Sequence, residues 1–468
     1  MSVQAVRRDY SLSGGNRDAV ELDGDGILGR IEEQWWKPKL SRQQMREIMR
    51  RRDGPGLWHF GLWFLLLGVS AYLAAISWGT WWAVPAFLVY GTIYTSADSR
   101  WHESGHGTPF RTRWLNEVVY AIASFIAIRE AYLWRWSHSR HHTHTYFVGR
   151  DPEIQVQRPA DLVKLLMDFF YLRSGPPEVW RLIRNACGRP NDDVRDFVPE
   201  RDLQKMYWSS RVHVAIYCAF AIWSIAIGSI LPMMFVLLPR FYGGWLQQLL
   251  SLPQHAGLGE DTYDHRENTR TIYVNPVFAF LYVNMQYHLE HHAMPMTPFH
   301  ALPKLHKAVK EQMPPPYRSL WAAYKELIPA LIKQATGDPD YRVIRPIPRD
   351  PETEAVETQT AGESTGEWTA VGAVEEIEEE EVIRFDHGSR TLAVYRLKGD
   401  RYYATDGLCT HEYAYLADGL VIDGVIECPL HNGRFDIATG RALRAPACDH
   451  LETYPVERRG NTIFVRPG

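Results

Sequence analysis

The chain has 468 residues, which at about 100–200 residues per domain predicts two to four domains and excludes a single small module. Its 51 Lys and Arg nearly balance 55 Asp and Glu, so the net charge of −4 gives no reason to expect nucleic acid as a partner. Five cysteines, an odd number spread over a long chain, do not make a disulfide framework. Residues 366–468 hold 18 acidic and 11 basic residues, whereas the remainder holds 37 acidic and 40 basic, which indicates two electrostatically different bodies.

The N-terminal segment is polar before it becomes basic. Residues 1–30 are rich in Gly and Asp without apolar periodicity, and we expect a flexible N-terminal arm. Residues 31–52 resemble an amphipathic interfacial helix, because Trp35 and Trp36 precede a series of basic residues. Basic residues just before an apolar run favour a cytoplasmic position for that end.

Four long apolar runs follow in two pairs. Each run is long enough to cross a hydrocarbon core of about 30 Å at about 1.5 Å per residue, so four transmembrane helices are predicted. A fifth stretch, Val118–Trp134, contains Arg129 and Glu130, which are costly at the bilayer centre, and we expect it to lie in the interface or re-enter. The four runs are Leu57–Trp78, Trp81–Ala97, Val212–Leu231 and Pro232–Leu250.

Nine of the 19 histidines cluster in four groups beside these runs. In HxxxH the imidazoles are four residues apart, and in HxxHH they are three and four apart, so on a helix each group faces one side. Such spacing allows several ring nitrogens to bind one metal; imidazole-only sets suit Fe, Zn, Cu or Ni, and spacing alone does not choose among them. The groups are His102 with His106; His138, His141 and His142; His255; and His288, His291 and His292.

These histidine motifs resemble those of the membrane-bound di-iron fatty-acid desaturases and related alkane hydroxylases. The similarity spans about residues 35–330 and implies two non-heme irons held by the nine histidines, with O₂ as co-substrate for oxidising an unactivated C–H bond. The stretches 264–270 and 294–300 are most similar to a bacterial branch that includes a rhizopine-catabolism oxygenase, thought to remove a methyl group oxidatively. The motifs are Trp101–His106, His138–Thr145, Gln254–Leu258 and Asn284–His292.

Other polar residues near the motifs have less defined roles. His144 and His265 are candidates for holding a ligand in its tautomer. Glu103, Glu290 and Asp151 also lie near the motifs, but the resemblance implies no required carboxylate ligand. The roles of these five residues stay open at the level of sequence.

The C-terminal part differs from the rest of the chain in composition and residue pattern. Residues 341–365 lack an apolar repeat and predict a flexible linker. Residues 366–468 contain short β-rich runs that alternate with Gly and Asp turns, which predicts a small antiparallel β domain. We therefore expect a helical membrane domain over residues 31–340, followed by a separate all-β domain.

A second set of metal-ligand types lies in this β domain: Cys409 and His411, then Cys428 and His431. Two Cys and two His suit either zinc or a Rieske [2Fe–2S] centre, in which two thiolates hold one iron and two imidazoles the other. The flanking stretches 407–411 and 428–436 resemble the Rieske ferredoxin family. That resemblance implies one [2Fe–2S] cluster bound by these four residues and an electron carrier for an oxygenase.

The combined prediction is a multidomain chain, an α-helical integral membrane domain with four transmembrane helices and interfacial helices followed by a small all-β Rieske domain. The predicted function is an O₂-dependent di-iron monooxygenase that hydroxylates an unactivated C–H bond, including oxidative demethylation. Desaturation of a fatty-acyl lipid is the alternative, since the same oxidant serves both reactions. A histidine-rich membrane metal transporter is a remote alternative that leaves the Rieske domain without a role.

The expected partners follow from the electron supply and the apolar runs. Because no flavin or nicotinamide motif is recognised, a separate NAD(P)H-dependent flavin reductase must supply electrons. The substrate is a lipid or a small molecule, nucleic acid is not expected, and homo-oligomerisation is left open. We expect the chain in the inner membrane, with the di-iron site and the Rieske domain on the cytoplasmic side.

Overall fold

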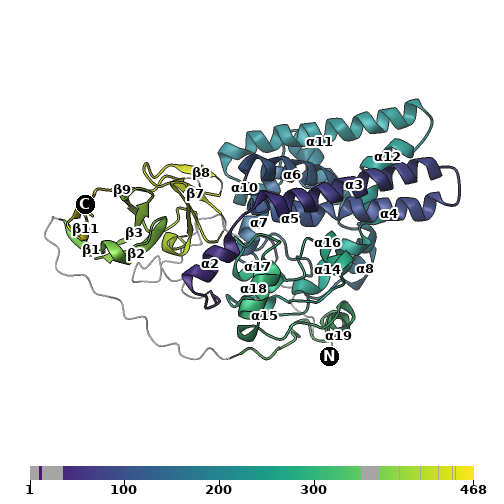
Figure 1. Cartoon of the computed structure of the whole chain (residues 1–468). Coiled ribbons are helices and arrows are strands. Elements are labelled where there is room, and N and C mark those ends of the chain that lie inside the picture. Colours follow the sequence, from purple (N-terminus) through teal and green to yellow (C-terminus); the bar gives the residue numbers. More distant parts are fainter. Residues whose placement is uncertain are drawn as a thin grey trace. The chain divides into compact units, whose positions relative to one another are not determined.

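The computed structural model describes residues 10–12, 35–348 and 368–467, apart from single positions 389, 412, 431, 445 and 448. The chain divides into two compact units, one built chiefly from residues 36–293 and 297–348 and the other from the residues after 348. The first is helical and the second is made of short strands, which confirms the predicted order (Figure 1). Most of the predicted N-terminal arm lies outside the described residues.

The first unit contains both short and long helices. Its first helix starts with a capping box, in which the Ser41 hydroxyl accepts a hydrogen bond from the Gln44 amide and the Gln44 side chain accepts one from the Ser41 amide. The helices are α2 (Arg42–Met49), α3 (Asp53–Ser77), α4 (Ala83–Thr95), α5 (Ala97–His106), α6 (Arg113–Ile126), α7 (Ala131–Thr143), α8 (Leu162–Met167), α9 (Gly175–Ala186), α10 (Asp192–Phe197), α11 (Glu200–Ala226), α12 (Leu231–Val236), α13 (Pro239–Gly243), α14 (Trp245–His255), α15 (His265–Asn268), α16 (Pro276–Leu281), α17 (His288–Ala293), α18 (Leu302–Val309) and α19 (Leu320–Thr336).

Two segments in the described part of the chain are long and apolar enough to cross a membrane, Gln43–Ser77 and Glu200–Ala226. The other predicted spans are divided. The run Trp81–Ala97 forms α4, whose 13 residues reach only about 20 Å, before the chain continues into α5. The run Pro232–Leu250 is shared among α12, α13 and α14. Four transmembrane helices are therefore not confirmed.

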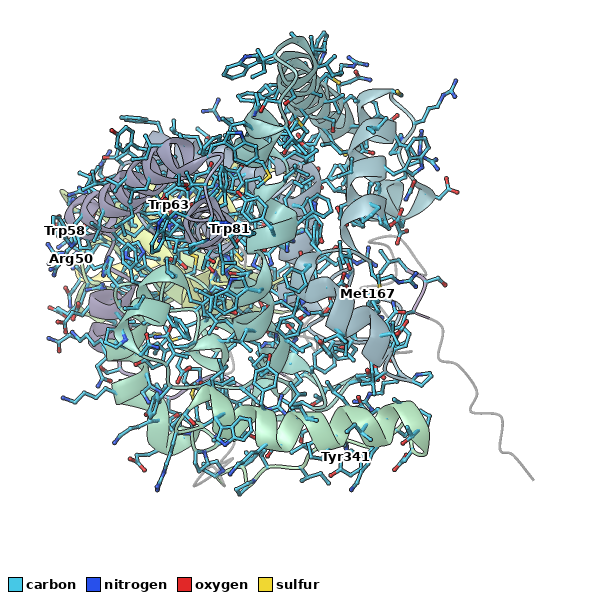
Figure 2. The ribbon with its side chains drawn as sticks, turned by 90° about the vertical axis from the view of Figure 1, so that its right-hand side faces the viewer. Arg50, Trp58, Trp63, Trp81, Met167 and Tyr341 are labelled. Atoms are coloured by element: carbon cyan, nitrogen blue, oxygen red, sulfur yellow. The ribbon has the colours of Figure 1, made fainter. Side chains whose placement is uncertain are left out.

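The outer surface of this unit is apolar around α3 and α4. Trp58 and Trp81 are 74% and 91% exposed, whereas Trp63 is fully buried (Figure 2). The Trp63 indole N–H donates to the Ile93 carbonyl oxygen at 3.0 Å and to the Ser96 hydroxyl at 3.1 Å. This buried tryptophan fixes α3 against the junction of α4 and α5, and α5 carries the first histidine pair.

Close packing of α4 against α13 requires glycine on both helices. A Cβ placed on Gly243 would lie 2.1 Å from the Gly91 carbonyl carbon, and one placed on Gly91 would lie 2.3 Å from the Tyr242 ring. Gly243 also accepts a hydrogen bond from the Thr95 hydroxyl at 2.8 Å. The contact sets the position of α14, which ends in His255, relative to α5.

The stretch Val118–Trp134 is not one helix. Helix α6 ends at Ile126, Ile128 takes a left-handed conformation with φ 58°, and α7 begins after Glu130. The Glu130 carboxylate accepts a hydrogen bond from the Leu133 amide at 2.7 Å, which caps α7. The charged pair at positions 129 and 130 therefore lies in a turn rather than inside a single long helix.

The second unit contains three antiparallel sheets, in the orders β1-β11-β10, β2-β3-β4-β9 and β5-β6-β7-β8. Its core is formed by inward-facing residues such as Leu392, Val394, Ile426 and Phe435. The strands are β1 (Thr369–Ala373), β2 (Glu381–His387), β3 (Arg390–Leu397), β4 (Arg401–Asp406), β5 (Leu420–Ile422), β6 (Val425–Glu427), β7 (Arg434–Asp436), β8 (Ala442–Arg444), β9 (Thr453–Tyr454), β10 (Val456–Arg459) and β11 (Thr462–Val465).

The start of the predicted linker is attached to the helical unit. The Val343 amide donates to the Gly257 carbonyl oxygen at 2.9 Å, and the Arg345 guanidinium donates to the Thr269 carbonyl oxygen at 2.7 Å. Residues 341–348 therefore extend the helical unit, and the rest of the predicted linker lies outside the described residues.

Candidate metal centre

The nine histidines singled out by sequence lie together in two groups. We call them the five-histidine group and the four-histidine group. Within each group, one ring nitrogen from every residue lies within 4.8 Å of those of the others. The five-histidine group is His102, His106, His138, His142 and His291; the four-histidine group is His141, His255, His288 and His292.

Helical spacing explains how one motif serves both groups. On α7, His138 and His142 are four residues apart and share a face that joins the five-histidine group, whereas His141 points to the other group. Helix α17 repeats the pattern with the opposite assignment, because His288 and His292 belong to the four-histidine group and His291 to the five. The two HxxHH motifs thus link the two groups.

The distances between imidazole nitrogens fit metal binding. The Nε2 atoms of His106 and His138 are 3.0 Å apart, and those of His255 and His288 are 2.9 Å apart. Two nitrogens at right angles on a metal, with bonds of about 2.1 Å, are about 3.0 Å apart. Both ring nitrogens of His102 are buried without a hydrogen-bond partner in the described part of the chain. A cation held by the five-histidine group would satisfy one of these two nitrogens.

Polar partners orient the rings through their far nitrogens. The Nδ1–H of His141 donates to the Asp151 carboxylate at 2.8 Å, and Nδ1 of His138 lies 3.3 Å from the Glu153 carboxylate. The Nδ1 of His255 contacts the Asn268 carbonyl oxygen at 2.9 Å. Each contact leaves Nε2 directed at its group, which is how outer partners fix metal-binding histidines.

Burial and mutual proximity keep most of these imidazoles neutral. Burial, with a further contribution from neighbouring histidines, lowers the pKa of His102, His288 and His291 well below the ordinary value. Burial acts on His141 in the same direction, but the adjacent Asp151 carboxylate raises its pKa instead. A neutral imidazole has the lone pair that a metal requires.

Residues next to the two groups include His306, which was not expected from sequence, and candidates that were. The His306 Nδ1 contacts the Glu290 carboxylate, and the Tyr273 hydroxyl lies 2.8 Å from the His306 Nε2. Nothing in the sequence singles out His306, because it meets Glu290 only through packing of α18 against α17. The His265 ring lies 5.2 Å from that of His292, whereas the His144 ring lies beside Phe147.

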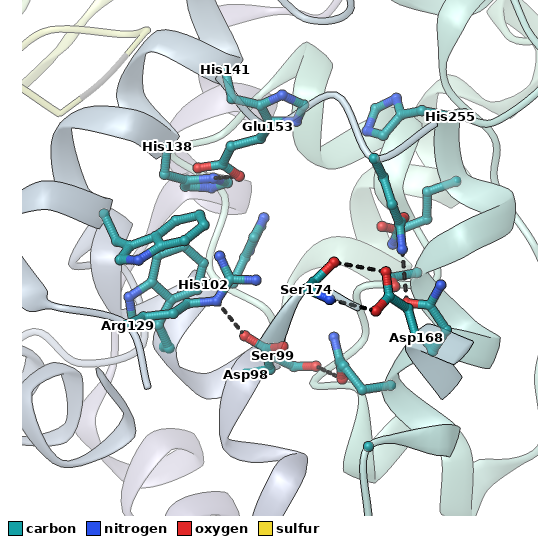
Figure 3. Close-up of a pocket in the computed structure, with 18 of the residues that line it drawn as sticks. Asp98, Ser99, His102, Arg129, His138, His141, Glu153, Asp168, Ser174 and His255 are labelled. Atoms are coloured by element: carbon teal, nitrogen blue, oxygen red, sulfur yellow. Dashed lines mark hydrogen bonds and ion pairs between the residues drawn. The ribbon is translucent and has the colours of Figure 1, made fainter. Parts of the chain in front are cut away.

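A cavity of about 310 Å³ reaches both histidine groups. His102 and His138 line it from the five-histidine group, and His141, His255 and His288 line it from the four-histidine group. In Figure 3, His138, His141 and His255 lie on one side of this space and Asp98 and Ser99 on the other. The cavity is therefore placed where a substrate would meet both groups.

The second site lies in the β unit. Cys409 and Cys428 are buried members of one core cluster, and neither forms a disulfide. Each starts a tight turn: the Cys409 amide donates to the Ala414 carbonyl oxygen and the Cys428 amide to the Gly433 carbonyl oxygen, both at 2.8 Å. His411 lies in the first turn, and the fourth predicted ligand, His431, lies outside the described residues.

Comparison with protein families supports both sites. A family model described as fatty acid desaturase matches residues 79–324, which contain all nine histidines. The chain belongs to the fatty acid desaturase family. A second model, the Rieske [2Fe-2S] domain, matches residues 367–455. The predicted fusion of a desaturase-type domain with a C-terminal Rieske domain is confirmed.

The Rieske domain is similar to ferredoxins of dioxygenase systems. The ferredoxin component of the naphthalene 1,2-dioxygenase system of Pseudomonas aeruginosa is 44% identical over 101 residues, which are 22% of this chain and 96% of that protein. The anthranilate 1,2-dioxygenase ferredoxin subunit of Burkholderia cepacia is 41% identical over 22% of this chain and 94% of its own length. A solved ferredoxin of carbazole 1,9a-dioxygenase from Nocardioides aromaticivorans IC177 is 34% identical, with a TM-score of 0.21, over 22% of this chain and 98% of its own.

The family and the histidine geometry together establish the cofactors and the general chemistry. The Rieske domain implies a [2Fe–2S] cluster, and the desaturase domain with its two histidine groups implies a di-iron centre. The protein is thus an iron-dependent oxidoreductase that contains its own electron-transfer domain.

Proposed function

We propose that the chain hydroxylates an unactivated C–H bond, with O₂ as the oxidant and the Rieske domain as the immediate electron donor. The observation that carries this proposal is the occurrence of two convergent histidine groups and a Rieske domain in one chain. The reaction balances as R–H plus O₂, two electrons and two protons giving R–OH plus water. Where the C–H bond belongs to an O-methyl or N-methyl group, the product breaks down with loss of formaldehyde.

In this proposal the five-histidine group holds one iron and the four-histidine group the other. When bound, the two irons supply the activation of O₂. The protein contributes orientation: Asp151 and Glu153 hold His141 and His138 with Nε2 toward the iron sites. Cys409, His411, Cys428 and His431 hold the [2Fe–2S] cluster, with two thiolates on one iron and two imidazoles on the other.

The electrons come from outside the chain. The similar proteins are ferredoxin components of dioxygenase systems, which supports a carrier role for the Rieske domain. A separate NAD(P)H-dependent flavin reductase supplies this carrier. Joining the carrier to the oxygenase raises its effective concentration to about millimolar, which favours two successive one-electron transfers in each turnover.

The location follows from the apolar segments. Gln43–Ser77 and Glu200–Ala226 have the length and composition to anchor the helical unit in a membrane. We propose that the unit is integral to the inner membrane, with α4 and the α12–α14 region completing two helical pairs. Basic residues before α3 support a cytoplasmic position for the histidine groups and the Rieske domain.

Desaturation is the second candidate function, favoured by the family that the chain belongs to. It consumes the same inputs, because R–CH₂–CH₂–R′ plus O₂, two electrons and two protons gives R–CH=CH–R′ plus two waters. The two reactions therefore differ in the fate of oxygen. Hydroxylation leaves one O₂ atom in an organic product, which is the released formaldehyde when the oxidised group is an O-methyl or N-methyl group, whereas desaturation leaves none.

The test combines metal analysis with isotope labelling. The purified full chain should contain about four irons and two acid-labile sulfides. With reductase and NAD(P)H, ¹⁸O₂ should label the product of the wild type, and His291→Ala should abolish product formation while His300→Ala, outside both groups, retains it. An unlabelled product with a new double bond would establish desaturation instead. Stoichiometric zinc without labile sulfide would exclude both reactions.

A further inference from the structure

The cavity beside the histidine groups is lined by polar and aromatic side chains. Of the 28 residues that line it, only Pro152, Ile154 and Met285 carry aliphatic side chains, and the aromatic ones are Trp101, Trp134, Tyr146, Tyr171 and Tyr282. Pockets for apolar ligands are lined chiefly by aliphatic and aromatic groups, with few polar ones. A saturated acyl chain in this space would leave amide and hydroxyl groups facing hydrocarbon, where they lose the hydrogen bonds that water provides. The lining therefore fits a small molecule with both polar and apolar groups better than a long acyl chain.

Four glutamine and serine side chains of the cavity lining are hydrogen-bonded in pairs. The Ser99 hydroxyl donates to the Gln247 amide oxygen at 3.1 Å, and the Gln248 amide oxygen accepts from the Gln155 side chain at 2.8 Å. The Gln248 Nε2 is buried and has no hydrogen-bond partner in the described part of the chain. A buried amide donor without a partner is uncommon in proteins, and a ligand oxygen in the cavity would satisfy it.

The most buried charges of the cavity are paired with protein partners. Asp98 pairs with Arg129 at 2.8 Å and with Arg240 at 2.9 Å. Glu153 faces the ring of His138. These pairs hold the walls of the cavity together. Lys164 and Asp168 also line the cavity, and the Asp168 carboxylate accepts hydrogen bonds from the Ser174 amide and hydroxyl.

The volume of the cavity and the space next to it also favour a small ligand. A volume of about 310 Å³ corresponds to about ten water molecules, enough for a small molecule. A second cavity of about 620 Å³ shares Trp134, Pro152 and Ile154 with the first, and its lining includes Asp192, Asp193 and Asp196. The neighbouring space therefore also contains charged groups, which suits a substrate that arrives from water.

We propose that the substrate is a small molecule with several hydroxyl groups, held by Ser99, Gln247 and Gln248 with its reacting C–H bond toward the histidines. This inference rests on the proposed oxidation of a C–H bond and names the substrate class for that same site. Gln248 is a binding residue in this scheme, because its free amide donor meets a ligand oxygen.

The first experiment identifies the substrate fraction. Host cells that express the wild-type chain or His291→Ala are extracted into aqueous and lipid phases, and both phases are analysed by mass spectrometry. We expect a compound in the aqueous phase to be depleted, with gain of oxygen or loss of a methyl group, only in wild-type cells. A change confined to the lipid phase would overturn this inference and leave the proposed function intact. No change in either phase would overturn the proposed function as well.

The second experiment tests the binding residues with the aqueous compound. Gln248→Leu and Ser99→Ala should each raise its KM by about tenfold or more, since a site built to hydrogen-bond a hydroxyl group loses most from an apolar replacement. The compound should raise the melting temperature of the wild-type protein but not of Gln248→Leu, a readout independent of turnover. Gln204→Leu, an exposed change on α11, is the control. Unchanged KM and melting shift in both variants would overturn the assignment of the cavity.

Discussion

The two metal-binding regions of this protein are built in different ways. The nine histidines of the helical unit lie between residues 102 and 292, on four helices that meet only through tertiary packing. The Rieske ligands lie between residues 409 and 431 in the sequence, and Cys409 and Cys428 each begin a hydrogen-bonded turn of the small β unit. One centre depends on long-range contacts and the other mainly on local ones. Their sensitivity to substitution should differ accordingly.

Packing and hydrogen bonding hold the two sites in different ways. In the helical unit, buried side chains such as Trp63 and close helix contacts such as Gly91 with Gly243 set where the histidine-bearing helices lie. In the Rieske unit, backbone hydrogen bonds from Cys409 and Cys428 close each turn within a few residues. The helical centre additionally needs buried carboxylates to orient its rings.

The largest effect is expected from loss of a Rieske ligand, which should remove one cofactor and leave the other bound. Cys428→Ala should abolish NAD(P)H-driven turnover and remove the acid-labile sulfide, because a Rieske iron loses one of its two thiolates. The iron of the histidine centre should stay bound, since its ligands lie in the other compact unit. Iron and sulfide analysis with electron paramagnetic resonance measures both pools, and Cys218→Ala, an exposed cysteine, is the control. Loss of both iron pools would contradict the independence of the two regions.

A smaller effect is expected from the partner of a histidine. Asp151→Asn removes the negative charge that accepts the His141 Nδ1–H and should weaken iron binding by the helical centre about 10–100-fold. Iron retention during dialysis against a chelator measures this loss, and the Rieske spectrum should be unchanged. Asp338→Asn, at an exposed position, is the matched control. Equal retention by both variants would show that the carboxylate does not support the site.

A further effect, on stability rather than on metal binding, concerns the turn before α7. Burial raises the pKa of Glu130 to about 7, so the folded state binds a proton that the unfolded state releases above its ordinary pKa of 4.5. The free energy of unfolding should therefore fall as pH rises from about 4.5 through about 7, by up to about 3 kcal/mol. Glu130→Gln, which keeps an oxygen to cap α7, should remove this loss.

Thermal unfolding of the purified chain at about pH 5 and about pH 8 measures the effect. Glu130→Gln should raise the melting temperature at the higher pH and change it little at the lower one. Glu117→Gln alters an exposed carboxylate of the same region and serves as the control. An equal effect of Glu130→Gln at both pH values would mean that ionisation of Glu130 does not act on folding.

The spacing of the histidines predicted much of the helical centre. Four-residue intervals place His138 with His142 and His288 with His292 on single helix faces, whatever the rest of the chain does. The same reasoning cannot say that His141 joins His288 and not His142, because that choice depends on how α7 meets α17. The charges at Arg129 and Glu130 argued against a span at Val118–Trp134, and the break at Ile128 agrees.

The predicted spans depended more on context. Trp81–Ala97 has the composition of a transmembrane helix, but α4 ends at Thr95 and the chain continues into the histidine-bearing α5. Hydropathy is averaged over a window of residues, so it does not detect a junction between two helices such as α4 and α5. The linker likewise begins later than its composition indicates. Arg345 donates hydrogen bonds to carbonyl oxygens of the helical unit that lie far from it in the sequence.

By itself the sequence determined the identities of the ligands, their helical spacing, the order of the two domains and the Rieske turns, because each of these depends on residues close together in the chain. Only the tertiary structure decided which histidines share a group, that Glu153 supports His138, and that the adjoining cavity is lined by Ser99, Gln247 and Gln248. These features depend on packing between separate segments of the chain, 15 residues apart for Glu153 and His138 and 148 residues apart for Ser99 and Gln247. No local pattern encodes which of the many polar side chains will face the same space.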